Sequence, residues 1–287
     1  MEILEKARAK LNISLDILGR LPNGYHEMRM ILQTVTLCDD VRVRVEPGTG
    51  IAVSTNLRFL PADGRNIAVK AAKLFYEETG LEGFRTEIRL KKRIPVCAGL
   101  AGGSSNAAAV LRALNQIHKL GLSREALEKM GEKLGSDVPF CVAGGTVQAR
   151  GRGEILEALP PLPHCFVVIC KPAFSISTPE LFSRVNWKKI RVRPNTEQLI
   201  ACLSAGDLGG TARRMYNVFE DVLPARCQEV ATVKSRLLDF GALGASMSGT
   251  GSAVFGLFDR EEKAREAYEA LKKDYQDCFL TESTGRV

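Results

Sequence analysis

The first half of the chain alternates apolar and polar residues in several short stretches. Residues 11, 13, 15 and 17 are Leu or Ile, and residues 12, 14 and 16 are Asn, Ser and Asp. Alternation of this kind is typical of a strand with one buried face, so we predict a strand over residues 10–19. The Pro22-Asn23-Gly24 sequence that follows predicts a turn over residues 21–27. Further strands are predicted at residues 28–37, 40–46, 84–90 and 144–153.

Other stretches of this half repeat their apolar residues every three or four positions. This spacing is typical of a helix with one buried face. Ser123 is suited to cap the start of the last of these helices, and Gly135 is suited to end it. The predicted helices cover residues 66–78, 107–118 and 123–134.

A proline-rich stretch at residues 159–163 separates this half from the rest. Because such stretches are typical of linkers, we place a domain boundary near residue 158. We therefore expect an α+β protein with two domains, residues 1–157 and 158–287. In the second domain we predict strands at 165–170 and 253–258 and helices near 196–203, 209–219, 225–240 and 261–274.

The composition excludes several classes of protein. The chain has 287 residues, of which 45% are hydrophobic and 25% charged, unlike a disordered chain, a collagen or a disulfide scaffold. No stretch predicts a membrane span, and the first residues do not resemble a secretory signal. The eight cysteines are scattered, with no Cys-x-x-Cys pair, so we expect reduced, buried thiols and no metal site. These features predict a cytoplasmic protein without a membrane partner.

The formal net charge of +7 suits an anionic ligand such as a nucleotide, and it also permits nucleic acid. The tightest basic run is Lys91-Lys92-Arg93, and it contains no aromatic residue. A short run of this kind is typical of a solvated strand end. We therefore expect no nucleic-acid partner.

The segment 99–106 is the strongest candidate for ligand binding. It contains three glycines and two serines and leads directly into a predicted helix. The first turn of a helix offers unpaired N–H groups and the positive end of the helix dipole, so a phosphate chain fits there. No lysine follows the glycines and residue 101 is Ala, so neither of the two common phosphate-loop patterns matches. The alternative is a turn capped by Ser104 or Ser105.

A second segment, residues 249–252, is also rich in glycine and ends in a serine. Two interpretations are open: it contacts a ligand, or it is a turn between a helix and a strand.

Two charged residues are candidates for catalysis. Asp137 is either a helix cap or a general base. Lys10 is either a solvated strand-end lysine or a cation that would keep Asp137 ionised and place positive charge near the substrate oxygen. In the predicted turn, Tyr25 and His26 could contact a flat ring or simply cover the turn.

These segments resemble the GHMP kinase superfamily, which includes galactokinase, homoserine kinase and mevalonate kinase. Its three signature regions match in order at residues 9–12, 95–107 and 246–252. Together with residues 23–26 and 135–140, these motifs resemble the branch that phosphorylates the 2-hydroxyl of a cytidine diphosphate-linked methylerythritol. That reaction is a step of the non-mevalonate route to isoprenoid precursors.

The resemblance implies a GHMP kinase fold of two α+β domains with the active site in the cleft between them. It implies ATP and Mg²⁺ as cofactors, Lys10 and Asp137 as the catalytic pair, and a monomer or weak homodimer. The implied ATP-binding residues are Pro95, Val96, Cys97, Ala98, Gly99, Leu100, Ala101, Gly102, Gly103, Ser104, Ser105 and Asn66, with Lys92 or Arg93 as weaker candidates near adenine. The implied substrate-binding residues are Asn12, Tyr25, His26, Thr178, Phe182, Gly249 and Thr250, with Gly251 beside them. No glutamate matches the metal ligand of related kinases.

Two residues depart from the family pattern. Ala101 stands where Gly is usual, and a positive φ at that position would cost about 1 kcal/mol. Cys97 replaces a smaller residue. We expect altered loop packing and retained activity.

Three rival functions stay open at this stage. The first is a sibling kinase for mevalonate or homoserine, but those substrates have no base to stack on Tyr25. A non-catalytic ligand sensor would not need both Lys10 and Asp137. An RNA-binding protein would need a basic face rich in aromatic residues, which the sequence lacks.

Overall fold

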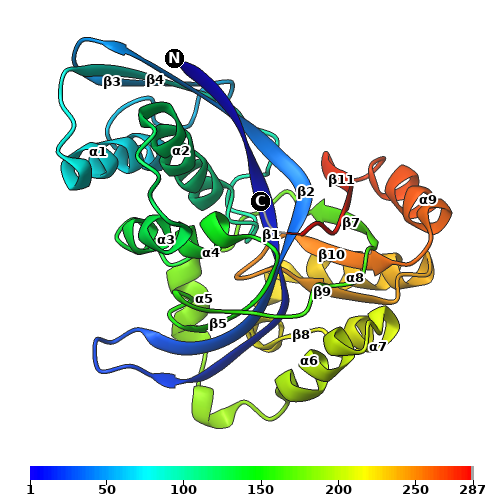
Figure 1. Ribbon diagram of the computed structural model, residues 1–287. Coiled ribbons are helices and arrows are strands. Elements are labelled where there is room, and N and C mark those ends of the chain that lie inside the picture. The colour runs from blue at the N-terminus through cyan, green and yellow to red at the C-terminus, as the bar shows by residue number, and fades with distance from the viewer. Residues whose placement is uncertain (286–287) are drawn as a thin grey trace.

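The computed structural model describes residues 1–285 (Figure 1). A seven-stranded sheet is built around a long antiparallel hairpin, β1 (Glu2–Arg20) and β2 (His26–Pro47). The predicted turn between them is confirmed. However, β1 begins eight residues earlier than predicted, and the two strands predicted at 28–37 and 40–46 are one continuous strand.

The alternating residues of β1 do not all share one face, contrary to the simplest interpretation of the pattern. The pairing register of β1 with β2 shifts between Asn12 and Ser14. Leu11 and Ile13 consequently pack in one apolar cluster, whereas Leu15 and Ile17 pack in the other. A bulge of this kind turns a strand about its axis, so β1 contributes side chains to both apolar clusters. Lys10 and Asn12 lie between the two clusters.

The other strands of this sheet come from both halves of the chain. They lie in the order β3-β4-β2-β1-β8, with β5 paired to β2 and β6 paired to β5. The sequence analysis missed β3 and β6. It was also wrong about residues 209–219, where a short helix gives way to β8, which pairs in parallel with β1 at Ser14 and Leu15. The bounds are β3 (Ile51–Thr55), β4 (Phe84–Lys91), β5 (Thr146–Gly151), β6 (Ile155–Ala158) and β8 (Tyr216–Asn217).

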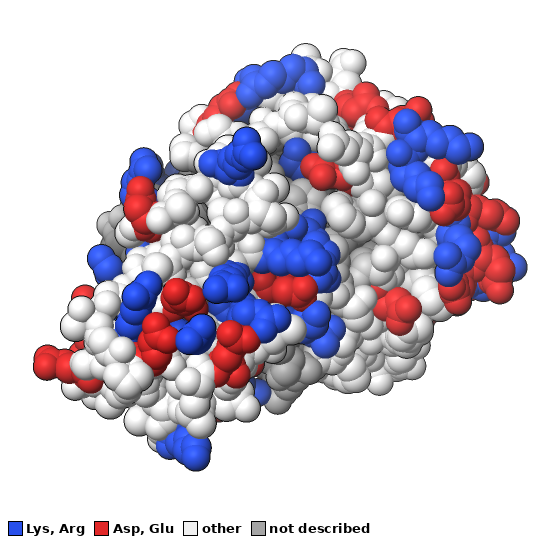
Figure 2. Space-filling model, turned by 90° about the horizontal axis from the view of Figure 1, so that it is seen from above, with Lys and Arg blue, Asp and Glu red and all other residues white. Residues whose placement is uncertain are grey.

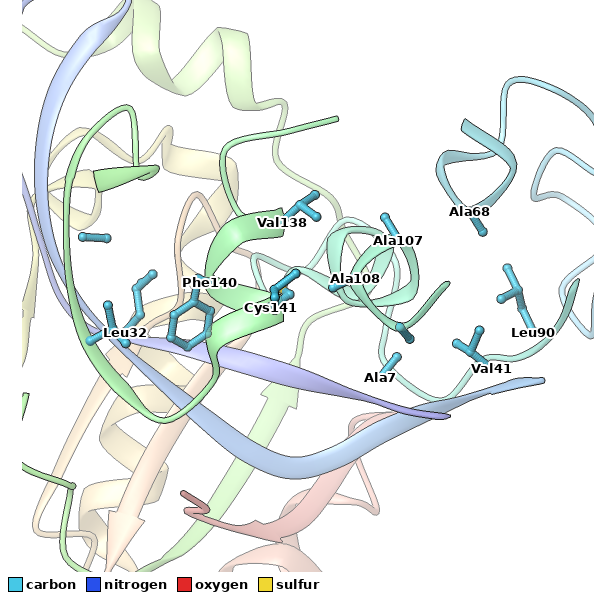
Figure 3. Close-up of a cluster of buried hydrophobic side chains, with 14 of the residues drawn as sticks. Ala7, Leu32, Val41, Ala68, Leu90, Ala107, Ala108, Val138, Phe140 and Cys141 are labelled. Atoms are coloured by element: carbon cyan, nitrogen blue, oxygen red, sulfur yellow. The ribbon is translucent and has the colours of Figure 1, made fainter. Parts of the chain in front are cut away.

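Four helices lie together beside this sheet (Figure 1). The predicted Ser123 cap is confirmed, since its side chain accepts a hydrogen bond from Ala126 N at 3.2 Å. Ala107 and Ala108 on α2 belong to the same apolar cluster as Phe140 of α4 and Leu32 of β2, with α4 between α2 and Leu32 (Figure 3). The helices are α1 (Ile67–Thr79), α2 (Gly102–His118), α3 (Arg124–Glu132) and α4 (Val138–Ala143).

A second, four-stranded antiparallel sheet has the order β11-β7-β10-β9, with α8 and α9 packed on it. The sequence analysis missed β11 and α5, and it extended the last helix beyond its end at Leu271. The strands are β7 (Phe166–Lys171), β9 (Gly244–Met247), β10 (Val254–Phe258) and β11 (Asp277–Glu282). The helices are α5 (Thr178–Arg184), α6 (Thr196–Ser204), α7 (Leu208–Arg213), α8 (Glu229–Asp239) and α9 (Glu261–Leu271), with short 3₁₀ turns at Trp187–Lys189, Val218–Val222 and Ala225–Cys227.

Strands β1 to β6 of the first sheet end at Ala158, and the first strand of the second sheet, β7, begins at Phe166. The proline-rich segment joins them, which is compatible with the division that we proposed at residue 158. The two halves are nonetheless connected, because β8 joins the first sheet and Ser283 bridges to Val35 of β2.

Basic and acidic side chains are intermingled on the face of the molecule shown in Figure 2. Ion pairs include Lys6–Asp40 at 2.6 Å and Arg44–Glu46 at 2.9 Å. Exposed pairs contribute only about 0–1 kcal/mol each, so the apolar clusters dominate the stability of the fold. Among the described helices, none combines the length and apolar character that crossing a bilayer requires.

Phe75 on α1 is fully buried in the first apolar cluster. We expect Phe75→Ala to lower the free energy of unfolding by about 3–5 kcal/mol, because it removes buried apolar surface and leaves a cavity. Chemical denaturation would measure the change. The control is Glu77→Ala, an exposed position on the same helix. Equal stability of the two variants would contradict the assignment of Phe75 to the core.

Candidate active site

The glycine-rich segment forms a loop that leads into α2. Ala101 precedes the helix with a left-handed backbone, φ 56°, and no side chain caps the helix start. The alternative of a turn capped by Ser104 or Ser105 is therefore wrong. Ser105 instead donates from its hydroxyl to the carbonyl of Arg8. Helix geometry leaves the first N–H groups of α2 without partners inside the helix, and no side chain caps them, so they can donate to a ligand.

Gly99 is required by close packing as well as by its φ of +75°. A Cβ added at this position would lie 2.0 Å from the carbonyl oxygen of Ser248, which directly precedes the second glycine-rich segment. Cys97 and Ala101 also have positive φ, at 54° and 56°. Because a side chain disfavours that conformation, the expected cost of about 1 kcal/mol applies to both departures from the family pattern.

Two cavities lie on either side of this loop. The larger has a volume of about 830 Å³ and the smaller about 410 Å³, both within the range of small-molecule sites. Cys97, Gly99 and Ala101 line both cavities. All eight cysteines are free, as expected. The expectation of buried thiols is wrong for Cys97, which is exposed because its loop separates two open cavities.

The larger cavity brings Lys10 and Asp137 together from distant parts of the chain. Lys10 Nζ lies 3.9 Å from Asp137 Oδ2, with the lysine side chain 5% exposed and the aspartate side chain 36% exposed. Asp137 stands at the N-cap position of α4, but its side chain makes no capping hydrogen bond. Its carboxylate is therefore available to the cavity.

Asn12 holds the Lys10 ammonium in place. Lys10 Nζ donates to Asn12 Oδ1 at 2.5 Å, and both residues are buried at the point where β1 changes faces. Ser136 lines the same wall and was not among the candidates from sequence.

Ser248 is a residue of the site that sequence reasoning missed. Its buried hydroxyl donates to Gly99 O at 2.9 Å and accepts from Asn12 N at 3.2 Å. Asn217 supports the same segment by donating to Met247 O and Gly249 O, each at 2.8 Å. A signal was present in the sequence, because Ser248 lies within residues 246–252, the third signature region of the resemblance, but it was not singled out.

The other end of the larger cavity carries aromatic rings. The rings of His26 and Phe182 stack, with centroids 4.9 Å apart, and Tyr25 lines the cavity with 56% of its surface exposed. Burial, and secondarily the charge of Arg20, lowers the pKa of His26, which favours its neutral ring. Leu15, Met28, Met30, Ile176 and Phe219 add an apolar wall that sequence analysis did not single out.

Thr178 and Thr250 close one side of the cavity. Their hydroxyls lie 2.9 Å apart and join the start of α5 to the second glycine-rich segment, whose Gly249 and Gly251 also line the cavity. All the substrate-binding candidates from sequence thus line this cavity.

The smaller cavity is lined by Asn66, Lys92 and all the residues from Pro95 to Gly103. Asn66 also caps α1, accepting a hydrogen bond from Ala68 N at 3.0 Å. The Lys92 ammonium is buried and paired with Asp39, and it donates to Asn106 Oδ1 at 2.9 Å. Arg93 lies outside the cavity and pairs with Asp40, so of the two weaker candidates the structure brings only Lys92 to this space.

The comparisons with known proteins identify the family of the chain. The family description "GHMP kinases N terminal domain" matches residues 66–145, and "GHMP kinases C terminal" matches residues 199–277. A 4-diphosphocytidyl-2-C-methyl-D-erythritol kinase of Alkaliphilus metalliredigens is 43% identical over 98% of this chain and 96% of its own. One of Bacillus pumilus is 43% identical over 99% and 98%. The chain belongs to the 4-diphosphocytidyl-2-C-methyl-D-erythritol kinase family of the GHMP kinases.

Solved structures show the same fold. A crystal structure of 4-(cytidine 5'-diphospho)-2C-methyl-D-erythritol kinase has a TM-score of 0.83 and 33% identity, covering 99% of this chain and 100% of its own. Homoserine kinase from Cytophaga hutchinsonii has a TM-score of 0.77 at 23% identity, covering 99% and 95%, which shows the fold alone. The expectations of a GHMP kinase fold and of an ATP-dependent kinase are confirmed.

We expect Ser248→Ala to lower kcat about 10-fold, because Gly99 O and Asn12 N lose their partner and small displacements of catalytic groups are costly. Steady-state kinetics would measure this. The matched control is Ser252→Ala, since that buried hydroxyl also donates to a carbonyl, Phe174 O at 2.7 Å, but does not contact β1. An equal loss of kcat in both variants would contradict a specific role for Ser248.

Proposed function

We propose that this enzyme transfers the γ-phosphoryl group of ATP to the 2-hydroxyl of 4-diphosphocytidyl-2-C-methyl-D-erythritol, a step of the non-mevalonate route to isoprenoid precursors. One observation carries the proposal: a single cavity has the Lys10–Asp137 pair at one end and the rings of Tyr25, His26 and Phe182 at the other. The curated relatives named above carry the name of this activity.

ATP fits the loop between the two cavities. The smaller cavity would take the adenosine, beside Asn66 and the Pro95–Gly103 segment. The triphosphate would cross the loop at Gly99 and Ala101, which line both cavities, towards the first N–H groups of α2. Its terminal phosphate would then reach the larger cavity near Ser104, Lys10 and Asp137.

The residues at that point suit phosphoryl transfer. The reaction passes through a loose transition state and needs alignment and charge stabilisation more than covalent chemistry. Asp137 would accept the proton of the attacking hydroxyl, and Lys10, fixed by Asn12, would stabilise negative charge on the transferring group. The products are ADP and the phosphorylated alcohol.

Mg²⁺ fits this site as an ion held mainly by phosphate. Among residues 1–285, no group of three or more His, Cys, Asp or Glu side chains is placed to hold a metal. Ser104 and Asp137 are oxygen donors that line the larger cavity. Mg²⁺ prefers oxygen ligands and keeps few protein ligands in kinases, so the Ser104 hydroxyl would suffice beside the phosphates and would leave Asp137 to accept the proton, and the ion would neutralise triphosphate charge.

The aromatic end would hold the cytosine. A flat base can stack on Tyr25, and Phe182 would supply a second ring beside it. Mevalonate and homoserine have no base, so this end of the cavity separates the proposed substrate from theirs.

The setting of the enzyme is also part of the proposal. We place it in the cytoplasm as a monomer or weak homodimer without a nucleic-acid partner. Its eight free cysteines suit a reducing compartment.

Asp137→Asn is expected to lower kcat by about 10²–10⁴-fold, because the amide cannot accept the proton. ADP release, measured by a coupled assay with and without the cytidine substrate, tests both the residue and the reaction. Asp239→Asn, at an exposed position of α8, is the control. Unchanged kcat in Asp137→Asn would exclude the residue as the base, and ADP release that is independent of the substrate would exclude the reaction.

Tyr25→Ala is expected to raise KM for the cytidine substrate about 10-fold or more, since base stacking on an aromatic ring is lost. KM for ATP should stay within about 2-fold, because the ring acts on one substrate only. Kinetics with each substrate varied in turn would measure both. The control is Tyr268→Ala on α9, outside both cavities. Equal effects on both substrates would contradict the base site.

A further inference from the structure

The turn between β5 and β6 brings Arg152 into the larger cavity, next to the aromatic end. The guanidinium carbon of Arg152 lies 5.3 Å from the centroid of the Tyr25 ring, within the range of a cation–π contact. Nothing in the sequence analysis pointed to Arg152, which lies 127 positions after Tyr25 along the chain.

Tyr25 has few other contacts to fix its ring. It stands at the tip of the β1–β2 hairpin, and its backbone N–H is held by Asn23 Oδ1 at 3.1 Å. Within residues 1–285 its hydroxyl makes no hydrogen bond, and more than half of its surface is exposed. A ring in this position would sample several rotamers unless a neighbour restricts it.

Arg152, in contrast, is held firmly. Its backbone N–H donates to Glu154 Oε2 at 2.7 Å. Its guanidinium nitrogens lie 3.3 Å from Glu132 Oε1 and 3.7 Å from Glu154 Oε1. Glu132 ends α3, so these contacts connect the turn to the helical layer. The side chain is 27% exposed.

We infer that Arg152 is a positioning residue for substrate recognition. Its guanidinium covers one face of the Tyr25 ring and holds the other face in place for the base of the cytidine substrate. The ring would then be ordered before the substrate arrives, which lowers the entropic cost of stacking. This inference rests on the proposed function, because it needs a base at Tyr25.

A direct contact of Arg152 with the diphosphate of the substrate is the alternative role. Two carboxylates, Glu132 and Glu154, already lie against the guanidinium and offset its charge. At the reacting end of the cavity, Lys10 faces the single carboxylate of Asp137. The contacts of Arg152 therefore favour stacking on Tyr25 over anion binding.

The first experiment is Arg152→Gln, assayed at saturating ATP and then at saturating cytidine substrate. We expect KM for the cytidine substrate to rise about 3–10-fold, with kcat, KM for ATP and the thermal unfolding midpoint nearly unchanged. The matched control is Arg150→Gln, two residues earlier on β5, which pairs with Glu157 at 3.5 Å and lies outside the cavity. An unchanged KM in Arg152→Gln, or an equal change in both variants, would overturn the inference.

The second experiment combines Arg152→Gln with Tyr25→Ala. If Arg152 acts through the ring, the double variant should have the same KM for the cytidine substrate as Tyr25→Ala alone. Multiplication of the two effects would overturn the positioning role and indicate direct binding. Failure of Tyr25→Ala by itself to raise KM would overturn the base site and this inference with it, so the two failures are distinguishable.

Discussion

The site depends on one close junction of three chain segments. The loop at residues 97–101 is hydrogen-bonded to β1 on one side, where Lys10 N donates to Leu100 O at 3.1 Å. On the other side it is hydrogen-bonded to the second glycine-rich segment, where Ala253 N donates to Ala98 O at 3.1 Å and Ser248 Oγ donates to Gly99 O at 2.9 Å. Only glycine at residue 99 permits this approach, since a Cβ would collide with Ser248 O. This contact fixes the backbone at Lys10 and the loop that leads into α2.

The junction explains why strained residues persist in the loop. Cys97 and Ala101 have left-handed backbones, which disfavour side chains, and such conformations last only where neighbouring contacts hold them. The first residues of α2 line both cavities, since Gly102 and Gly103 line the smaller one and Ser104 lines the larger one. Cys97 is exposed because it lines both cavities, whereas Ala98 and Leu100 of the same loop are buried in an apolar cluster.

Much of the local structure follows from local pattern. The alternation in β1, the spacing in α1 and the Ser123 cap depend on residues within a few positions of each other, and they were predictable. Strands β3, β6 and β11 were missed because each is four to six residues long and is stabilised by pairing with a distant strand. The helix expected over residues 209–219 fails for the same reason, since pairing of Tyr216 and Asn217 with β1 outweighs helix propensity.

The amino-acid sequence by itself determined the candidates, because a glycine run before a helix suits a phosphate chain, and the resemblance to the GHMP kinases singled out Lys10 and Asp137 among the charged residues. Only the tertiary structure decided that Lys10 and Asp137 face each other, and that the Asp137 side chain makes no capping hydrogen bond. It also decided that Ser248 and Arg152 belong to the site. The physical reason is separation along the chain: Ser248 and Asn12 are 236 residues apart, and a hydrogen bond across that distance leaves no local pattern. Irregular pairing of β1 adds to this, since its register with β2 shifts between Arg8 and Lys10 and again between Asn12 and Ser14, without any change in the alternation.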